Sequence, residues 1–379
     1  MAAPSAQDLP KTHQALVLLS TSEPLSLQTV PTPSPTPGSV VVRVLSANIS
    51  SYSGDIYNGK RGYPIPTPSI VGASGIGRIV ATGPDTVALS PGDLVLIDSG
   101  IYGRDDPDTK ILFGIHEGFS DASRKLMAGE WRNSTYAEYA KVPLENCERL
   151  DEKRLCSSVS EGGLGYEIEE LGRLHEHAIA MGGLDDVNVE VGDTVIVAPA
   201  TGNFGRAAVR VAVALGAAKV IAMGRDQSKL DALAESHERI SAVRITGYVA
   251  ADTAALKEKL GKGKGADVYF DISPPAATSS SHFKSCITAL RPHGRVSLMG
   301  GVTGDVALPL VWIMFQNITL KGTYMYTREQ RKKLVKMLEG GLMVFEKGSV
   351  KKFGLHEWDA AAKAASDAAG TEASCVICP

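Results

Sequence analysis

Two patterns of hydrophobic and polar positions divide this chain. Up to about residue 165, short β-branched or alternating runs such as SVVVRVLSA (39–47), SIVGASGIGRIVATG (69–83) and DLVLID (93–98) are separated by Gly, Pro and Asp. Runs of this kind predict strands joined by turns. Residues 99–134 are polar and irregular, and we expect them to pass over the surface of this β-rich region.

From about Gly192, short apolar runs alternate with helical stretches such as the small-residue segment 205–215. Parallel neighbours in a sheet need a crossover connection, which such helices supply, so this half predicts a parallel sheet. Six strands in this order favour a doubly wound dinucleotide-binding fold. The runs expected to form them are TVIVAPA, KVIAM, RITGYV near Arg244, DVYFDIS, RVSLMG and ITLKGTYM.

The two patterns predict an α/β protein of two domains, which suits a length of 379 residues. We expect a β-rich domain over 1–165 and a six-stranded parallel Rossmann domain over 166–327. Residues 328–379 begin with an expected helix and end in the alternating run SCVICP. Because this tail is too short to fold alone, we expect it to pack back onto the first domain.

Composition and charge narrow the function classes. A hydrophobic content of 44% and a charged content of 21% are typical of soluble globular proteins. The formal charge of −3 gives no electrostatic reason to expect nucleic acid or an anionic membrane as a partner. The chain shows neither a signal peptide nor an apolar run long enough to cross a bilayer, so we expect a cytoplasmic protein with a small-molecule substrate.

The five cysteines have no regular framework and predict reduced thiols. Cys375 and Cys378 have the CxxC spacing of redox and metal motifs. The alternating pattern around them favours a closing strand instead.

The segment VAPATGNFGRAAV is the first candidate binding site, for the pyrophosphate of a dinucleotide. It predicts a buried strand, a tight turn and a helix whose small residues allow close packing on the sheet. Glycines in such a turn let the backbone approach a pyrophosphate, whose charge is favoured at the helix N-terminus. Pro199 replaces the first glycine of the GxGxxG pattern, and an ordinary strand–turn–helix is the alternative. The residues expected to contact the cofactor here are Thr201, Gly202, Asn203, Phe204 and Gly205.

The second strand of this half ends in MGRDQSKL, where nucleotide preference is decided. A carboxylate there binds the ribose hydroxyls of NAD, whereas a cation binds the extra phosphate of NADP. Gly224 leaves room for a phosphate, Arg225 can form a fork of hydrogen bonds to it, and Lys229 adds a charge. We therefore expect NADP(H). If Asp226 faces the ribose instead, NAD is preferred, and a solvated helix start is a further alternative.

Taken together, the order of these features resembles the medium-chain dehydrogenase/reductase superfamily over essentially the whole chain. The matching pieces are IVGASGIGRIVATG followed by GDLVLI, YAEYAKVP, EVGDTVIVAPATGNFG and the final VICP. The resemblance implies an N-terminal GroES-like catalytic domain followed by the dinucleotide-binding domain. Two segments, APATGNFGRAAV and VIAMGR, look most similar to zinc-free GroES-like alcohol dehydrogenase or quinone reductase-like proteins of fungal type.

Departures from the zinc-dependent members affect the expected mechanism. Ser50 or Ser51 stands where those members have a catalytic Cys, and their GHExxG motif is here GASGIG at 72–77. Hydroxyl and methyl groups cannot supply the ligands of a catalytic zinc. The pair His116–Glu117 is isolated and reads as solvated, so we predict no metal.

The resemblance also implies further site residues. In the family the segment SSYSGDIYNGKRGYP lines the cleft beside the nicotinamide, and loops at two strand ends contact the cofactor. Tyr52 is the first candidate proton donor and Tyr63 the second, with Ser51 and Asp55 as relay or orienting groups. Packing roles for Tyr52 and Tyr57, with a proton from solvent, are the alternative. The loop residues implied are Ser273, Gly300, Gly301 and Val302.

Three function classes remain open. An NADPH-dependent zinc-free reductase of activated C=C bonds or quinones is favoured, because charge developing on such substrates is delocalised and needs only proton delivery. An alcohol dehydrogenase or carbonyl reductase of the same fold is the alternative, and a non-redox cofactor-binding scaffold is the third class. Relatives pair through the strand near 319–325, which makes a homodimer the expected assembly. Trp131, Tyr136 and Trp312 could shape the substrate pocket or belong to the core.

Overall fold

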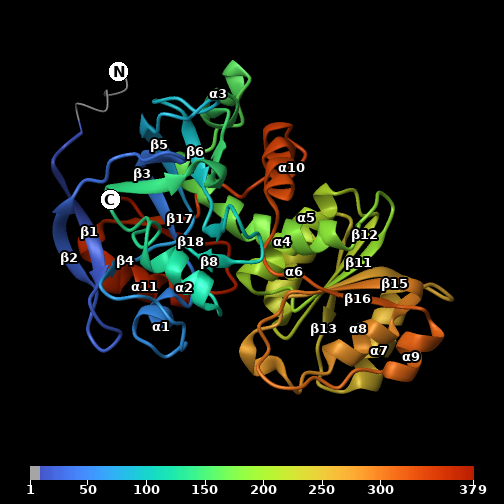
Figure 1. The fold of residues 1–379 in the computed structure, drawn as a ribbon. Coiled ribbons are helices and arrows are strands. Elements are labelled where there is room, and N and C mark those ends of the chain that lie inside the picture. Colours follow the sequence, from blue (N-terminus) through green and yellow to red (C-terminus); the bar gives the residue numbers. More distant parts are fainter. Residues whose placement is uncertain (1–8) are drawn as a thin grey trace. The chain divides into compact units, whose positions relative to one another are not determined.

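The structure, a computed structural model, describes residues 9–379 and divides them into two units (Figure 1). Unit 1 contains the chain up to His175 and the segment Phe345–Pro379, and unit 2 is Glu176–Val344. Between residues 9 and 379, no helix is long and apolar enough to cross a lipid bilayer.

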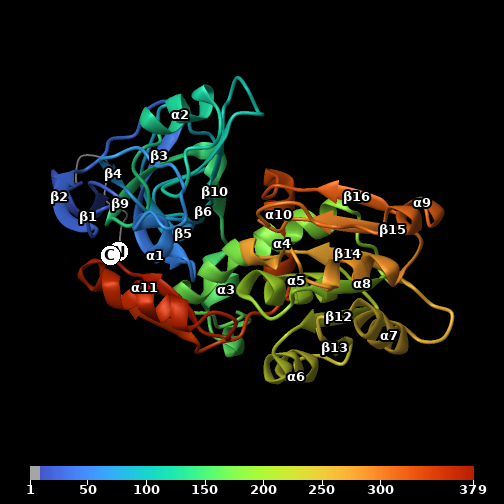
Figure 2. The same cartoon turned by 90° about the horizontal axis from the view of Figure 1, so that it is seen from below.

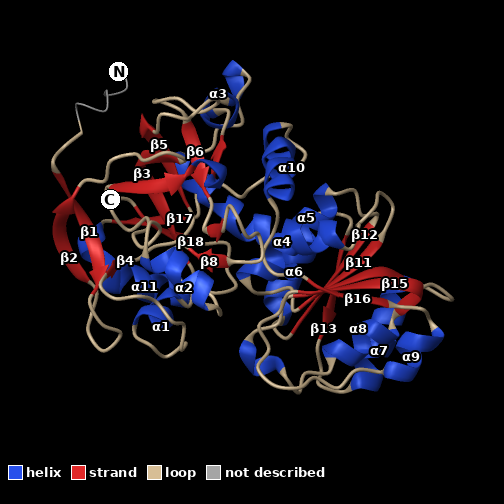
Figure 3. Cartoon of the chain, in the orientation of Figure 1, coloured by secondary structure: helices blue, strands red, loops and turns tan. Residues whose placement is uncertain are grey.

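Unit 1 is built on β-sheets, as Figure 3 shows by colour. A three-stranded sheet has the order β2-β1-β4, and a seven-stranded sheet has the order β10-β6-β5-β3-β18-β17 with β9 paired to β3. The strands are β1 (Thr12–Leu18), β2 (Ser26–Pro31), β3 (Ser39–Ile49), β4 (Ser69–Ile70), β5 (Gly75–Thr82), β6 (Leu94–Ile97), β9 (Tyr139–Pro143), β10 (Cys147–Arg149), β17 (Val350–Phe353) and β18 (Ser374–Ile377). The helices are α1 (Ser53–Tyr57), α2 (Asp121–Ala128), α3 (Glu152–Cys156) and α11 (Trp358–Asp367).

Strand β3 is central to this unit because both of its faces are covered. Val40, Val42 and Val44 face the main core, and Val41 packs with a smaller group on the opposite face. Successive side chains of a strand point to opposite faces, so a continuous apolar run such as SVVVRVL suits a strand buried on both sides.

The segment 99–134 is more ordered than its polar composition suggested. It contains the hairpin β7 (Gly100–Tyr102) and β8 (Lys110–Leu112) as well as α2. Ile101, Phe113 and Met127 are buried in the unit 1 core. The expectation of a surface excursion was therefore wrong, because widely spaced apolar residues anchor the segment.

The C-terminal return is made by β17 and β18. Strand β18 pairs antiparallel with β3, and β17 pairs parallel with β18. Helix α10 (Arg328–Glu339), predicted from the sequence to belong to the return, lies in unit 2. Its Gln330 side chain donates to the Gly182 carbonyl and its Lys333 pairs with Asp185, so the return begins later, at Phe345.

Unit 2 is the doubly wound domain expected from the sequence. Its six strands are all parallel, with the order β13-β12-β11-β14-β15-β16. The strands are β11 (Thr194–Ala198), β12 (Lys219–Gly224), β13 (Ile240–Arg244), β14 (Ala266–Asp271), β15 (Leu290–Leu298) and β16 (Thr319–Gly322). The helices are α4 (Leu174–Asp186), α5 (Asn203–Ala214), α6 (Gln227–Glu235), α7 (Val249–Leu260), α8 (His282–Thr288), α9 (Leu310–Phe315) and α10. Helices α7 and α8 pack side by side (Figure 2).

One strand of this sheet lies earlier than predicted. The third strand ends at Arg244, where the expected run RITGYV begins. Ile240 and Val243 are the buried residues of that strand. The following Thr246 instead donates its amide and hydroxyl to the buried Asp252 carboxylate, which fixes a loop.

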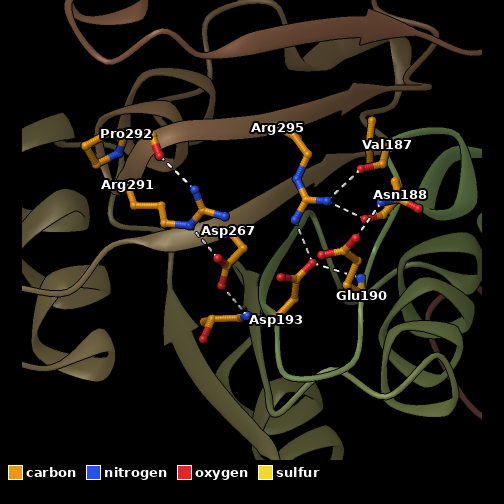
Figure 4. Close-up of polar contacts among 9 residues, drawn as sticks. Val187, Asn188, Glu190, Asp193, Asp267, Arg291, Pro292 and Arg295 are labelled. Atoms are coloured by element: carbon orange, nitrogen blue, oxygen red, sulfur yellow. Dashed lines mark hydrogen bonds and ion pairs between the residues drawn. The ribbon is translucent and has the colours of Figure 1, made fainter.

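Charged side chains hold the amino-terminal edge of this sheet together (Figure 4). Arg295 of β15 pairs with Asp193 at 2.6 Å and also donates to the Val187 carbonyl. Arg291 pairs with Asp267 at 2.5 Å, whose other oxygen accepts the amide of Thr194. The carboxyl ends of the strands, at the opposite edge, are where open α/β sheets bind ligands.

Candidate functional site

The bend between β11 and α5 is the first element of the candidate site. A Cβ atom on Gly205 would lie 2.2 Å from the Pro199 carbonyl oxygen, so only glycine fits there. A Cβ on Gly202 would meet no atom within 4 Å. Gly202 is the N-cap of α5 and no side chain caps the helix. Gly205 therefore allows the helix to approach the strand, while Gly202 leaves its backbone open at a helix N-terminus.

The bend and the end of β12 are in contact. The Ala200 amide donates to the Met223 carbonyl at 2.8 Å, and the Thr201 side chain lies against Gly224. A Cβ on Gly224 would come within 2.8 Å of Thr201 Cγ2. The structure thus brings the predicted residues Thr201 and Gly224 together. Asn203 and Phe204 follow in the first turn of α5, half-buried.

Arg225 and Asp226 take different orientations at the end of β12. Asp226 is the N-cap of α6, and its side chain accepts the Lys229 amide at 3.2 Å. A carboxylate at this position also interacts favourably with the helix dipole. The Arg225 side chain is exposed, and no hydrogen bond or ion pair holds it within the described part of the chain. Lys229 is half-buried one turn into α6.

The carboxyl ends of β14 and β15 carry the remaining predicted cofactor residues. These strands are neighbours, with Asp271 opposite Leu298. The Gly301 amide donates to the Ser273 carbonyl at 3.0 Å. A Cβ on Gly300 would lie 2.5 Å from Asp271 Oδ2, so a glycine is needed for the two loops to meet. Val302 follows and is half-buried.

A buried polar network lies beneath these loops, and sequence reasoning found only Ser273. The Ser273 hydroxyl donates to Asp271 Oδ1 at 2.5 Å and lies 2.9 Å from His282 Nε2. Since that hydroxyl has given its proton to Asp271, it accepts from His282 Nε2–H. His282 Nδ1 then accepts from Ser280 at 2.6 Å. The network fixes the loop after β14. The sequence feature that could have predicted it is Asp271, a carboxylate at the end of a buried apolar strand.

The candidate proton donors lie in unit 1, on either side of α1 in the sequence. Tyr52 is the N-cap residue of α1 and is half-buried, as are Ser51 and Tyr63. The guanidinium of Arg61 lies over the Tyr52 ring, with Cζ 4.0 Å from the ring centroid. Asp55 is exposed and pairs with Lys60 at 3.7 Å.

Other aromatic residues of this unit belong to the core. The Tyr57 hydroxyl donates to the Gly72 and Gly114 carbonyls at 2.9 and 3.1 Å, and burial raises the pKa of Tyr57 well above its usual value. Tyr136 donates to the Asn48 carbonyl, and both Tyr136 and Trp131 are buried in the same core. Of the two roles considered for Tyr136 and Trp131, shaping a substrate pocket or packing in the core, the structure favours packing in the core. Trp312 in unit 2 likewise packs against the core of the parallel sheet.

His116 is buried, contrary to the expectation of a solvated side chain. Its Nδ1 accepts the Gly118 amide at 2.8 Å, and its ring packs against Tyr63 and Phe119 at 4.9 and 4.8 Å between centroids. Burial lowers the pKa of His116 below 6.5. The neutral ring therefore carries its proton on Nε2.

The residues at the zinc-ligand positions are used structurally. Ser74 donates to the Ile97 carbonyl at 2.6 Å, and the Ala73 amide donates to Thr135 Oγ1 at 3.0 Å. Ser50 accepts the Ser53 amide with its backbone carbonyl. Over residues 9–379, no three His, Cys, Asp or Glu side chains are grouped so that they could hold a metal ion.

The CxxC pair lies on the closing strand β18 and just beyond it. Cys375 is buried and Cys378 half-buried, and both are free thiols. Burial raises the pKa of Cys375 and raises that of Cys378 to about 11. A reactive thiol needs a lowered pKa, so the position favours a structural role.

Comparison with known proteins assigns the two units to one family. An alcohol dehydrogenase GroES-like domain model matches residues 36–152, and a zinc-binding dehydrogenase model matches residues 204–340. The chain belongs to the medium-chain dehydrogenase/reductase superfamily. It is therefore an oxidoreductase of this superfamily, in which binding of a nicotinamide dinucleotide is expected.

Similar proteins share a low sequence identity with this chain, but the similarity covers most of the length of both chains. An L-threonine 3-dehydrogenase of Anaeromyxobacter dehalogenans is 26% identical over 87% of this chain and 89% of its own length. A probable D-xylulose reductase A of Aspergillus clavatus is 26% identical over 74% of this chain and 72% of its own. The crystal structure of AibC has a TM-score of 0.80 with 20% identity and covers 100% of this chain and 99% of its own. A zinc-binding dehydrogenase from Sinorhizobium meliloti, bound to NADP, has a TM-score of 0.75 with 18% identity over 98% and 100%.

Proposed function

We propose that this protein is an NADPH-dependent, zinc-independent reductase of activated C=C bonds or quinones in a small organic substrate. The observation that carries the proposal is the set of side chains at the positions of the catalytic zinc ligands. Ser50 or Ser51, Ala73 and Ser74 stand there, and the Ser74 hydroxyl donates to the Ile97 carbonyl. These side chains do not fit a tetrahedral zinc site, which needs nitrogen, sulfur or carboxylate ligands.

Preference for NADP(H) over NAD(H) rests on the end of β12. The Asp226 carboxylate caps α6 and accepts the Lys229 amide, while the exposed Arg225 guanidinium is available for a phosphate. Two solved structures of the same fold, the Sinorhizobium dehydrogenase and a crotonyl-CoA carboxylase/reductase, hold NADP. When bound, the reduced nicotinamide supplies a hydride.

The residues of unit 2 would bind and orient this cofactor. The open backbone at Gly202 and the first turn of α5 would receive the pyrophosphate, and Arg225 with Lys229 the 2′-phosphate. Ser273 and residues 300–302, fixed by the Asp271–His282 network, would lie beside the nicotinamide half. In unit 1, Tyr52 would give a proton to the substrate carbon next to the reduced position, with Tyr63 as second candidate and Ser51 or Asp55 as orienting groups.

A dehydrogenase or carbonyl reductase of polar alcohols and ketones is the second candidate. Its support is the names of relatives, which include L-threonine 3-dehydrogenase, D-xylulose reductase and L-arabinitol 4-dehydrogenase. Against it stands the lack of zinc-binding side chains at the ligand positions. An unactivated ketone develops its negative charge on one oxygen, and a bound metal would stabilise that charge as a Lewis acid.

We also propose a homodimer formed through the edge of the parallel sheet in unit 2. Strand β16 is the last strand of the sheet, and among residues 9–379 its backbone pairs with β15 alone. The adjoining helix α9 exposes Leu310, Val311, Met314 and Phe315, each more than three-fifths exposed. Exposed apolar side chains next to an open strand edge are typical of an interface.

A substrate panel with metal-analysed protein tests the proposal. We expect oxidation of NADPH with enones and quinones by protein that contains no stoichiometric zinc. Turnover of simple ketones or polyols without turnover of enones would favour the second candidate. Stoichiometric zinc that is required for turnover would contradict the mechanism.

A further inference from the structure

A cationic side chain lies between the two candidate tyrosines of unit 1. The Cζ atom of Arg61 is 4.0 Å from the Tyr52 ring centroid and 5.4 Å from the Tyr63 ring centroid. At these distances both rings attract the guanidinium through their π faces. Tyr63 in turn packs edge-on against the buried His116, so one side of this group is anchored in the core.

The loop that carries Arg61 is held by successive turns. The Arg61 amide donates to the Asp55 carbonyl at 2.9 Å, and the Gly62 amide donates to the Gly59 carbonyl at 3.0 Å. Gly59 and Gly62 have φ angles of 77° and 66°, which favour glycine. The side chain of Arg61 therefore projects from a defined backbone position.

Arg61 has no anionic partner in the chain from residue 9 to 379. The nearby Asp55 carboxylate pairs with Lys60 instead, at 3.7 Å. The Nε atom of Arg61 is buried and makes no hydrogen bond with any described residue. A partly buried guanidinium with unused donors is costly, and the aromatic faces offset only part of that cost. A ligand cannot reach the buried Nε atom, so an oxyanion from solution would bind at the Nη atoms, which make no hydrogen bond with residues 9–379.

We propose that Arg61 binds a carboxylate of the organic substrate, so that the substrates of this reductase are unsaturated carbonyl compounds that also carry a carboxylate. The inference rests on the proposed function, in which Tyr52 and Tyr63 adjoin the substrate. A guanidinium whose face is stacked on a ring keeps its N–H edge free, and that edge matches the two oxygens of a carboxylate. The rings beside it suit the apolar part of the same molecule.

A matched pair of ligands tests this proposal. Benzoylacrylate is an enone with a free carboxylate, and its methyl ester is the same enone without the charge. We would measure binding of both by titration calorimetry, to the protein alone and with NADP⁺, where no reduction occurs. We expect the acid to bind more tightly than the ester by about tenfold to a hundredfold, as for a charged hydrogen-bonded pair.

Variants then assign that preference to Arg61. Arg61→Gln should remove it, and Arg61→Lys should keep part of it, because lysine retains the charge but not the fork. Lys60→Gln is the matched control: it removes a neighbouring charge that is engaged by Asp55, and the acid–ester ratio should not change. If Arg61→Gln lowers the unfolding temperature, the Arg61→Lys ratio decides the result.

Three results would overturn the proposal. They are equal binding of acid and ester to the wild type, an unchanged ratio in both Arg61 variants, or weaker NADP⁺ binding by Arg61→Gln at an unchanged ratio. The last result would assign the guanidinium to the cofactor. Binding without NADP⁺ separates this inference from the proposed function, because a protein that reduces no enone should still distinguish the acid from its ester.

Discussion

At the scale of single residues, Arg225 and Asp226 show how adjacent side chains take opposite roles. Asp226 caps α6: one oxygen of its carboxylate accepts the Lys229 amide and is therefore already engaged in a hydrogen bond within the protein. Arg225 is exposed at the end of β12, where the adenosine half of a dinucleotide is expected. The nature of both side chains was evident in the sequence, but their orientation depends on where α6 begins.

Replacement of Arg225 tests its role toward the phosphate. Arg225→Ala should raise the KM for NADPH by about tenfold to a hundredfold and leave the KM for NADH nearly unchanged, because only NADPH carries the extra phosphate. Steady-state kinetics with both cofactors measures this. Lys262→Ala removes an exposed charge before β14, at the other edge of the sheet, and should affect neither cofactor. An equal rise for both cofactors in Arg225→Ala would remove the phosphate role.

Tyr52 is tested through turnover. Tyr52→Phe keeps the ring beneath Arg61 but removes the hydroxyl, so kcat for an enone should fall roughly tenfold or more while the KM for NADPH stays the same. The same change in Tyr57, which donates to two backbone carbonyls in the core, should lower stability instead. Normal turnover by Tyr52→Phe would assign proton delivery to solvent.

At the scale of elements, the β11–α5 bend uses two glycines for different reasons. Gly205 is enclosed by the backbone of Pro199 and Ala200, whereas Gly202 faces open space. A sequence pattern identified both glycines, but the structure alone separates packing from ligand access.

Two alanine variants distinguish these reasons. Gly205→Ala should reduce the free energy of unfolding by about 1–3 kcal/mol, because its methyl group would overlap the Pro199 carbonyl. Gly202→Ala should leave stability nearly unchanged but weaken NADPH binding, because its methyl group would lie where the pyrophosphate is expected. Thermal unfolding and calorimetry measure the two effects. If Gly202→Ala bound NADPH normally, the pyrophosphate would not lie at this bend.

The elements themselves were largely predictable from the sequence. Alternating strands and helices after Gly192 gave the parallel sheet, which the structure confirms. The third strand was displaced because Thr246, an apparent strand residue, bonds to Asp252. Of the Asp271–Ser273–His282 network, only Ser273 was predicted. The three residues lie within twelve positions of the sequence, but their side chains meet because the loop after β14 folds back and α8 packs beside β14.

At the scale of the whole molecule, buried histidines set the response of stability to acid. Burial lowers the pKa of His13 and of His116 below 6.5. In the unfolded chain these rings take up protons near that pH, so below it the unfolded state holds more protons than the folded state. Falling pH therefore favours unfolding.

His13 is chosen for the test because burial is the largest influence on its pKa and lowers it, outweighing the opposite influence of Glu138 and the Tyr139 backbone. The free energy of unfolding should fall as the pH drops below 6.5, and His13→Phe should make that fall smaller. Denaturant titrations over a pH series measure it. His356→Gln changes an exposed ring and should follow the wild type. An identical pH dependence in His13→Phe would show that His13 is not a source of the effect.

The central claim is that unit 2 holds a dinucleotide with an extra phosphate, with Arg225 rather than Asp226 toward its adenosine end. Calorimetric titration of the purified protein with NADPH and with NADH tests it most directly. We predict saturable binding of NADPH at one site per chain, at least about tenfold tighter than NADH. Tighter binding of NADH, or no binding of either nucleotide, would contradict the account.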